Sequence, residues 1–416
     1  MKIAIVGTGI SGLVVAHHLH RRHEITVFEA DERVGGHTNT VEVDLPEGRF
    51  AVDTGFIVCN DRTYPNFLGL LDELGVATQP SDMSFAVTAP GAGLEYRATN
   101  LSTLFAQRRN LLRPRFHRML ADILRFNRTL RRMVDAGEDR TEETLADLVE
   151  RLRCSPAFVD HFLVPFGSSI WSADPTTFLQ FPVATYARFM SNHGLLELVG
   201  RPTWRTVAGG SSTYVAAITE PFRDRIRTSS PVRKVVRDRN GRSIELATDG
   251  GVEQFDRVVL ATHSDQALRM LGDPSDAERS ILGSIAYQAN VATLHTDGRF
   301  LPATPRARAS WNFHAGAGDG RVATLTYWMN RLQDLPTSTP LLVTLNRHDE
   351  IEPDAVLGRF DYDHPVLDRE AISAQGRRDE IQGVDGTYFA GAYWGYGFHE
   401  DGVNSGLDVV RAIEGT

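Results

Sequence analysis

The sequence contains very little lysine and cysteine. Of its 44 basic residues only Lys2 and Lys234 are lysines, and Cys59 and Cys154 form no metal-binding or disulfide pattern. This cysteine usage is typical of the reducing cytoplasm. Histidines at positions 17, 18, 20 and 23 lack cysteine or carboxylate partners, so we expect them on the solvent-facing side of a helix. No metal site is predicted.

Long apolar runs are also lacking. No stretch of about 20 apolar residues could span a membrane, and the opening apolar run is too short for a signal peptide. The net charge of −9 and the pI of about 5.9 argue against a nucleic-acid partner. With 416 residues, 42% hydrophobic and 23% charged, the chain is expected to form a cytoplasmic globular protein of two domains or one interrupted domain.

The first 36 residues carry the strongest motif. A β-branched apolar run at residues 2–6 leads into Gly-Thr-Gly-Ile-Ser-Gly at residues 7–12, and apolar residues then continue at helical spacing. In such a strand–turn–helix, Gly7 permits the tight turn, Gly9 leaves room for a pyrophosphate, and Gly12 lets the helix pack on the strand. The helix N-terminus faces the phosphates. The pattern predicts a dinucleotide site.

An acid at the end of the next strand supports this interpretation. Glu29 follows the apolar run 25–28, about 20 residues after the glycines, where a carboxylate accepts a hydrogen bond from a ribose hydroxyl. A plain βαβ turn without ligand is the alternative. The combination of strand, glycines, helix and acid favours the cofactor.

Residues 29–38 distinguish FAD from NAD. Arg33 can pair with a phosphate, and Gly35 and Gly36 let the backbone approach the cofactor. This segment resembles the extended fingerprint of the flavin-containing amine oxidase superfamily, which includes protoporphyrinogen oxidases and carotenoid desaturases. The resemblance implies FAD.

A second strand, glycine-rich loop and helix close the chain at residues 386–413. The resemblance implies that this helix, like the matching helix of the superfamily, starts with its N–H groups pointing at the flavin ring. We therefore expect an α/β protein. Its Rossmann-like FAD-binding domain is discontinuous (1–60, 204–265 and 380–416), and an α+β substrate-binding domain (61–203 and 266–379) is inserted in it. Between the motifs we predict a hairpin over 41–52, a helix from 64 to 74 and two strands within 83–96.

The resemblance is closer than superfamily level. Residues 53–58, 63–66, 81–85, 169–172 and 200–204, and above all Gly-Tyr-Gly-Phe-His-Glu-Asp-Gly at 395–402, resemble two groups. These are bacterial FAD-binding oxidoreductases often associated with cyclopropane-fatty-acid synthases, and the amino-terminal region of the plant synthases. The resemblance implies a lipid-modification context.

Many amine oxidases place a lysine, through a water, beside the flavin N5. Neither lysine here is expected to reach it, and the absence of cysteine from 391–402 indicates non-covalent FAD.

The expected site comprises cofactor-binding and catalytic candidates. His399 is the best proton-transfer candidate because imidazole titrates near neutrality, and Glu400 or Asp401 could set its tautomer. A structural hydrogen bond near the cofactor is the alternative role for His399. Tyr396 and Trp394, with Tyr393 and Phe398, are expected to wall the flavin. The predicted cofactor-binding residues are Gly7, Gly9, Ser11, Gly12, Glu29, Ala30, Arg33, Gly35, Gly36, His37, Thr38, Gly55, Phe56, Val232, Ala261, Thr262, Gly391, Gly402, Val403 and Asn404.

Three functions are compatible with these residues. The first is an FAD-dependent oxidoreductase that transfers hydride between flavin N5 and a carbon of a fatty-acyl or other lipid-like substrate, by desaturation or by reduction of a methylene intermediate. The second is a small-molecule amine oxidase releasing hydrogen peroxide. The third is a non-catalytic flavoprotein partner of a lipid methyltransferase.

One segment stands out by charge. Residues 104–134 have helical apolar spacing, and their polar positions carry nine arginines and one acid, a local charge of +8. The sequence predicts an Arg-rich helix over 108–132. A solvated helix face is one interpretation. Docking on an anionic membrane or on an acidic protein is the other.

Overall fold

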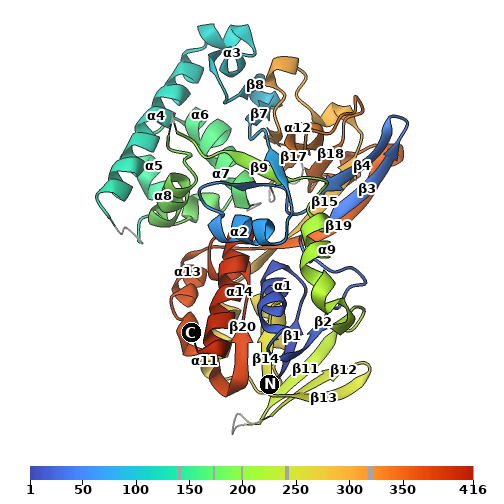
Figure 1. Cartoon of the computed structure of the whole chain (residues 1–416). Helices are drawn as coiled ribbons and strands as arrows, with labels where there is room; N and C mark the ends of the chain where they lie inside the picture. Colours follow the sequence, from blue (N-terminus) through green and yellow to red (C-terminus); the bar gives the residue numbers. More distant parts are fainter. Residues whose placement is uncertain (139–141, 172–173, 198–199, 239–242, 317–322, 416) are drawn as a thin grey trace.

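The computed structural model describes residues 1–138, 142–171, 174–197, 200–238, 243–316 and 323–415. Figure 1 shows two halves, with both termini in the lower one. The long strands β15 (Tyr287–His295) and β19 (Val356–Pro365) run along the junction. Among the described residues, no helix combines the length and apolarity needed to cross a membrane.

A five-stranded parallel sheet forms the centre of the lower half. Its strand order is β10-β2-β1-β14-β20, so distant parts of the chain build one sheet. Helices α1 and α14 lie side by side on one face (Figure 1). The bounds are β1 Lys2–Val6, α1 Ile10–Leu19, β2 Glu24–Phe28, β10 Ile226–Arg227, β14 Arg257–Leu260, β20 Thr387–Phe389 and α14 His399–Glu414.

The other face of this sheet is covered by a small antiparallel sheet and three helices. Apolar residues of these elements form one buried cluster with β1, β14 and β20. Apart from the first two residues of α10, the helices lie within 266–379, the segment expected in the substrate-binding domain. Their apolar faces nevertheless pack on the parallel sheet. The bounds are β11 Val232–Arg237, β12 Ile244–Thr248, β13 Gly251–Phe255, α10 Ser264–Met270, α11 Asp276–Gly283 and α13 Arg369–Gln375.

The described residues of the upper half contain a seven-stranded mixed sheet of order β19-β15-β18-β17-β16-β7-β8. Only β16 and β7 pair in parallel. Its remaining strands are β7 Phe85–Ala89, β8 Leu94–Arg97, β16 Trp311–His314, β17 Leu325–Trp328 and β18 Leu342–Leu345. The two strands predicted within 83–96 are thus confirmed as β7 and β8.

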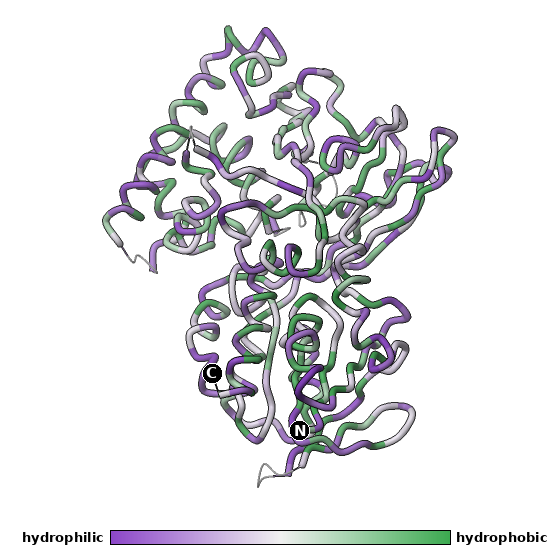
Figure 2. The backbone as a smooth tube through the Cα atoms, viewed as in Figure 1, coloured by the Kyte–Doolittle hydropathy of each residue, from purple (hydrophilic) through white to green (hydrophobic). Residues whose placement is uncertain are grey.

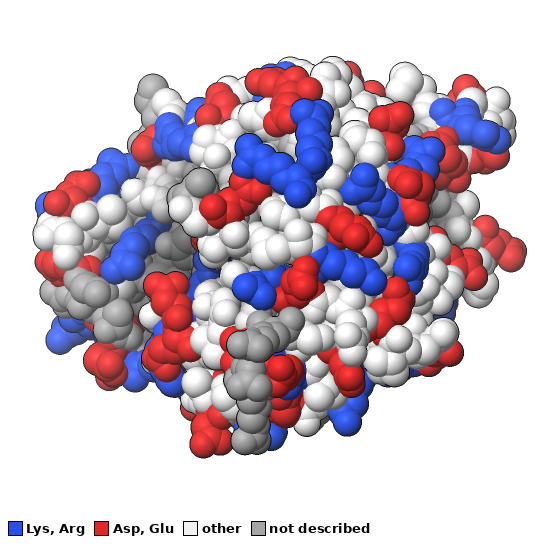
Figure 3. Space-filling view, turned by 60° about the horizontal axis from the view of Figure 1, so that its bottom comes forward, with Lys and Arg blue, Asp and Glu red and all other residues white. Residues whose placement is uncertain are grey.

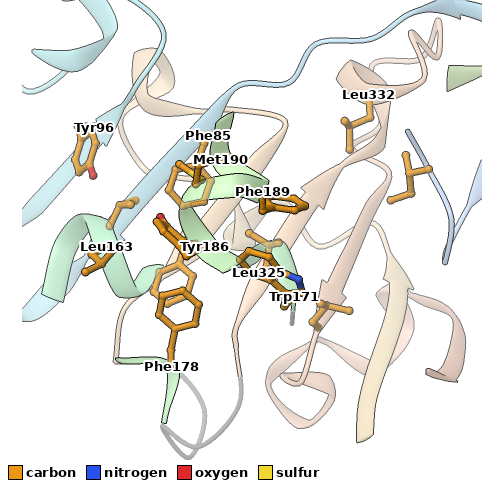
Figure 4. Packing of buried hydrophobic residues seen from close by; sticks show 14 of the residues in the cluster. Phe85, Tyr96, Leu163, Trp171, Phe178, Tyr186, Phe189, Met190, Leu325 and Leu332 are labelled. Atoms are coloured by element: carbon orange, nitrogen blue, oxygen red, sulfur yellow. The ribbon is translucent and has the colours of Figure 1, made fainter. Parts of the chain in front are cut away.

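A helical layer packs against this sheet and encloses the largest core cluster. Figure 4 shows Trp171, Phe178, Tyr186 and Phe189 gathered in it. The helices are α3 Leu101–Leu104, α4 Pro114–Asp135, α5 Leu145–Arg151, α6 Pro156–Phe158, α7 Val164–Trp171, α8 Val183–Asn192 and α12 Met329–Leu332.

The Arg-rich helix begins later than predicted. Residues Arg108–Leu112 form a separate 3₁₀ turn, and α4 starts at Pro114. Proline fits the first helical turn because it has no N–H to donate, and it forces the preceding Arg113 into extended backbone. Hydrophobic and hydrophilic residues alternate along α4 (Figure 2), as helical spacing requires.

Smaller elements join the two halves. The predicted hairpin is confirmed, because β3 and β4 pair in antiparallel register. The predicted helix is confirmed as α2, which packs against α14. A three-stranded sheet has the strand order β5-β9-β6. The bounds are β3 Thr40–Leu45, β4 Gly48–Asp53, β5 Cys59–Asn60, α2 Pro65–Glu73, β6 Thr78–Pro80, β9 Trp204–Val207 and α9 Ser212–Thr219.

Candidate functional site

The first glycine loop has the geometry that a pyrophosphate requires. Gly7 adopts φ +101°, and a Cβ there would lie 2.5 Å from the Ala261 carbonyl oxygen. A Cβ on Gly12 would lie 2.0 Å from the Gly7 carbonyl oxygen, whereas one on Gly9 would meet nothing within 4 Å. The hydrogen bonds of the helix start with the Leu13 N–H, which donates to the Gly9 carbonyl, so the N–H groups of residues 10–12 at the helix start are left for a ligand. An anionic cofactor therefore fits here.

Glu29 is held by the same loop. Its Oε2 accepts hydrogen bonds from the Thr8 N–H (2.9 Å) and the Thr8 hydroxyl, and its Oε1 accepts from the Asp31 N–H at 3.1 Å. The loop and the acid are thus positioned together, as a ribose-binding carboxylate requires. Thr8 is a contact that sequence reasoning missed, because the x positions of a glycine motif carry no signal.

The second glycine pair closes over the first loop. Gly36 has φ +57°, and a Cβ there would lie 3.0 Å from Gly9 Cα. Arg33 donates to the carbonyls of Gly36 and Thr38, each at 2.6 Å. Arg33 therefore ties this loop together through two backbone carbonyls, and its pairing with a phosphate stays a prediction. Gly35 N–H donates to the Thr8 hydroxyl at 3.1 Å.

The C-terminal motif meets the N-terminal one. A Cβ on Gly402 would lie 2.7 Å from Ile10 Cγ2, and one on Gly406 would lie 2.8 Å from the Ser11 carbonyl oxygen. The two helix starts, nearly 400 residues apart, are therefore in contact. Gly391 N–H donates to Ser405 Oγ at 3.0 Å, which ties the preceding loop to α14.

The other predicted cofactor residues lie around these two loops. Gly55 adjoins the second loop, where a Cβ would lie 2.1 Å from the His37 carbonyl oxygen, and Phe56 N–H donates to that carbonyl at 2.8 Å. Residues 229 and 230, which precede Val232, donate their N–H groups to the carbonyls of Asp31 and Glu29. Ala30 lies between these two acceptors. Ala261 and Thr262 lie beside Gly7. Val403 packs in one cluster with apolar residues of α1. The side-chain oxygen of Asn404 accepts a hydrogen bond from Asn66 Nδ2 at 2.7 Å.

His399 is engaged by neighbouring side chains. Its Nε2 lies 2.8 Å from the Tyr214 hydroxyl, which in turn bonds to Thr38 Oγ1 at 2.5 Å. Its ring stacks on Phe56 at 3.7 Å and 11°. Burial lowers the pKa of His399 to about 3. These contacts favour the structural role that the sequence left open.

Glu400 and Asp401 hold backbone rather than His399. Glu400 accepts the N–H groups of Asn66 (2.9 Å) and Phe67 (2.8 Å), so it caps α2. Asp401 accepts the N–H groups of Tyr396 and Phe398, and burial raises its pKa to about 6. The predicted tautomer-setting contact is absent from the described bonds, because successive helix residues point about 100° apart.

The aromatic residues before α14 divide between two clusters. Trp394 donates its indole N–H to the Phe389 carbonyl at 3.1 Å and packs with Tyr393 and Arg378. Tyr396 and Phe398 instead join the large core of the upper half. The loop therefore separates Tyr393 and Trp394 from Tyr396 and Phe398, and the wall that these four residues are expected to form along the flavin stays a prediction.

A cavity of about 550 Å³ lies beside the start of α14. Tyr396 and Phe398 form an aromatic part of its lining. The other lining residues come from the start of α2 and the segment that leads into it, from the end of α8 and the residue after it, and from the start of α14: Arg62, Thr63, Tyr64, Pro65, Asn66, Ser191, Asn192, His193, Glu400, Asp401 and Asn404. Its volume is that of a small-molecule site.

The fold and the paired glycine loops are those of an FAD-binding protein. The sequence model of the family "Flavin containing amine oxidoreductase" matches residues 10–414, and the chain belongs to this family. FAD is therefore its cofactor.

Relatives and solved structures agree with this assignment. A carotenoid phi-ring synthase of Streptomyces griseus is 28% identical over 72% of this chain and 58% of its own length. The chain spans under three fifths of the length of the curated relatives it matches. Cyclohexylamine oxidase from Brevibacterium oxydans has the same fold (TM-score 0.72, 17% identity, 99% and 98% of the two chains). So does a fatty acid isomerase from P. acnes that produces CLA (TM-score 0.69, 14% identity, 99% and 98%).

Proposed function

We propose that this oxidoreductase transfers hydride between FAD and a carbon of a hydrophobic, fatty-acyl or other lipid-like substrate. One observation carries the proposal: the residue directly before α14, Phe398, continues the largest apolar cluster. Its ring lies 5.1 Å from Phe189 and 6.4 Å from Trp171. An apolar wall thus extends to the helix start that the family resemblance directs at the flavin.

The neighbouring cavity supports an amphiphilic substrate. Its aromatic side is formed by Tyr396 and Phe398, and its other sides carry Asn66, Asn192 and Arg62. Apolar surface fixes a chain, and a few placed polar groups fix a headgroup.

Two comparisons give further support by what their names say. One relative is a synthase of a carotenoid ring, and one protein of the same fold is a fatty acid isomerase. Unactivated methylenes are poor hydride donors. The reacting carbon is therefore allylic or heteroatom-adjacent in a desaturation, or belongs to a methylene intermediate that accepts hydride.

An anaerobic experiment tests the proposal. The FAD-loaded protein is mixed with unsaturated phospholipids, methylated phospholipids and a panel of amines, and flavin absorbance is followed. Bleaching by a lipid supports the proposal, as does reoxidation of pre-reduced enzyme by a lipid acceptor. Bleaching by amines alone, with peroxide released in air, identifies an amine oxidase. Neither response, despite tight FAD binding, identifies the non-catalytic flavoprotein.

We also propose that the helical end of the upper half docks on an anionic membrane surface. Four leucines there are exposed, although leucine is usually buried: Leu101 (76%), Leu111 (49%), Leu112 (87%) and Leu124 (55%). They belong to α3, the 3₁₀ turn and α4. We call these four residues the leucine tip.

The arginines of this region divide into two groups. Arg118 and Arg125 pair with the buried Asp122, and Arg131 donates to the Leu196 carbonyl. Within the part of the chain that the structure describes, four others have no partner and can meet lipid phosphates: Arg108, Arg115, Arg128 and Arg132. The face in Figure 3 instead carries both signs of charge interspersed.

A further inference from the structure

Three histidines from distant segments gather beside the cofactor loops. His37 follows Gly36, His263 follows β14, and His364 lies on β19. The His37 ring lies 6.0 Å from that of His263 and 5.6 Å from that of His364. Each keeps part of its surface accessible. We call these three residues the imidazole cluster.

The position of His37 places this cluster at the FAD site. Gly36 closes over Gly9, and the His37 carbonyl accepts the N–H of Phe56, whose ring stacks on the first residue of α14. His37 therefore lies between the pyrophosphate loop and the start of α14. Its neighbour His364 lies on β19, the edge strand of the seven-stranded sheet, and its ring is 5.6 Å from that of His37.

A chain of hydrogen bonds behind His364 has a single possible direction. It starts at the Val291 N–H, which can only donate, and which bonds to Asn346 Oδ1 at 2.9 Å. The other end of that amide, Asn346 Nδ2, therefore donates, to the Ala323 carbonyl at 3.0 Å and to Asn290 Oδ1 at 2.8 Å. Asn290 Nδ2 is then the donor to His364 Nδ1 at 3.1 Å.

This direction determines the tautomer of His364. Nδ1 must accept, so the ring is neutral and carries its proton on Nε2. An imidazolium would point a second donor at the Asn290 amide, which is 2% exposed and cannot turn without breaking its bond to Asn346. Burial, and then the proximity of His263, lower the pKa of His364 to about 4, in agreement.

The Nε2–H of His364 has no acceptor among the described residues. The side chain keeps part of its surface accessible, so a bound ligand can reach this donor and supply the acceptor. The flavin ring system offers several nitrogen and oxygen acceptors. We propose that His364 donates its Nε2–H to the bound FAD, and that Asn290 and Asn346 are positioning residues that hold its tautomer. The inference rests on FAD binding and is independent of the proposed lipid substrate.

Affinity for FAD is the first test, and it needs no substrate. His364→Phe keeps a ring but removes the donor, and should weaken FAD binding about three- to tenfold, the effect of one hydrogen bond. His364→Gln can accept from Asn290 and still donate, and should stay within about threefold of the wild type. Asn290→Leu frees the ring and should give an intermediate loss. His117→Gln, at an exposed position of α4 in the upper half, is the matched control.

The second test is imidazole NMR of the folded wild type, with the His364 signal assigned by its disappearance in His364→Gln. We expect the Nε2–H tautomer from pH 8 down to pH 5, and a shift of this signal when FAD is added. An Nδ1–H or imidazolium form at pH 7, no shift with FAD, or wild-type FAD affinity in His364→Phe would each overturn the inference. A lipid that fails to reduce the flavin would leave it intact.

Discussion

Gly406 of α14 and Ser11 of α1 touch so closely that a Cβ on the glycine would lie 2.8 Å from the serine carbonyl oxygen. This contact joins the first and last helices of the chain. It aligns two helix N-termini toward one site, which is what an extended dinucleotide with phosphates at one end and a ring at the other requires.

Gly406→Ala should therefore destabilise the protein. Alanine favours a helix by about 1 kcal/mol over glycine, but here its methyl group meets backbone, and overpacking costs about 1–3 kcal/mol. We expect a lower urea midpoint and weaker FAD binding. Gly69→Ala is the control, because Gly69 lies in α2 with nothing within 4 Å of its Cβ, and it should be neutral or stabilising. Equal effects at both positions would contradict the close contact.

Glu29→Gln tests the ribose contact. The substitution keeps the size but replaces a charged acceptor by a neutral amide, so hydrogen bonds to it become weaker. FAD affinity, measured by quenching of flavin fluorescence, should fall about tenfold. The urea midpoint should fall as well, because one of the two oxygens that accept from Thr8 and Asp31 becomes an NH2 group. Glu32→Gln, an exposed neighbour, serves as the reference variant. Unaltered affinity in Glu29→Gln would show that the carboxylate serves only the Thr8 loop.

Local motifs predicted the part of the site that backbone sterics determine. The glycines at 7, 12, 402 and 406 lie where a Cβ would strike backbone or a packed side chain, so a spacing pattern is enough to find the first two and Gly402. The break before Pro114 also has a local cause that the helical periodicity of 104–134 concealed.

Side-chain partners could not be predicted in this way. Trp394 and Tyr396 are two residues apart, yet they pack in different clusters. His364, Asn290 and Asn346 meet only because β19, β15 and β18 are adjacent strands of one sheet. The alternation of apolar and polar residues along one strand does not tell which residues of a neighbouring strand lie opposite them. This chain of hydrogen bonds therefore has no signature in the sequence.

His399→Gln separates the two roles considered for that residue. If His399 is structural, the pH dependence of flavin reduction between pH 6 and 8 should be unchanged, because its pKa of about 3 lies far below this range. Loss of the Tyr214 hydrogen bond and the Phe56 stacking should lower stability by about 1–2 kcal/mol. Disappearance of an ionisation near neutrality from the rate profile would instead identify a proton-transfer residue.

Asp53 gives stability a defined pH dependence. It is fully buried and accepts bonds from Thr40, Ser211 and Gln333. Burial raises its pKa from 3.8 to about 6. The folded state therefore binds the proton more tightly than the unfolded chain, so this stabilisation is complete below about pH 4 and lost as the pH rises through 6.

Urea unfolding of wild type and Asp53→Asn from pH 4 to 7 measures this effect. A rise of the Asp53 pKa from 3.8 to about 6 corresponds to about 3 kcal/mol of folding free energy. The wild type should lose stability relative to the variant across this range, and the difference isolates Asp53 from Asp401, which titrates similarly. Parallel curves for the two proteins would show that Asp53 has an ordinary pKa.

Vesicle binding tests the leucine tip. Leu101→Ser with Leu112→Ser should weaken binding to anionic vesicles at least tenfold, because burying one leucine in lipid contributes about 1.5–3 kcal/mol. Arg115→Gln with Arg128→Gln should lower binding at low salt and flatten its salt dependence, since each arginine contributes about 1 kcal/mol electrostatically. Val252→Ser is the control, because this residue is 64% exposed on β13 in the other half. Wild-type vesicle binding by the leucine variant would refute membrane docking, and binding to acidic proteins but not to vesicles would identify a protein partner instead.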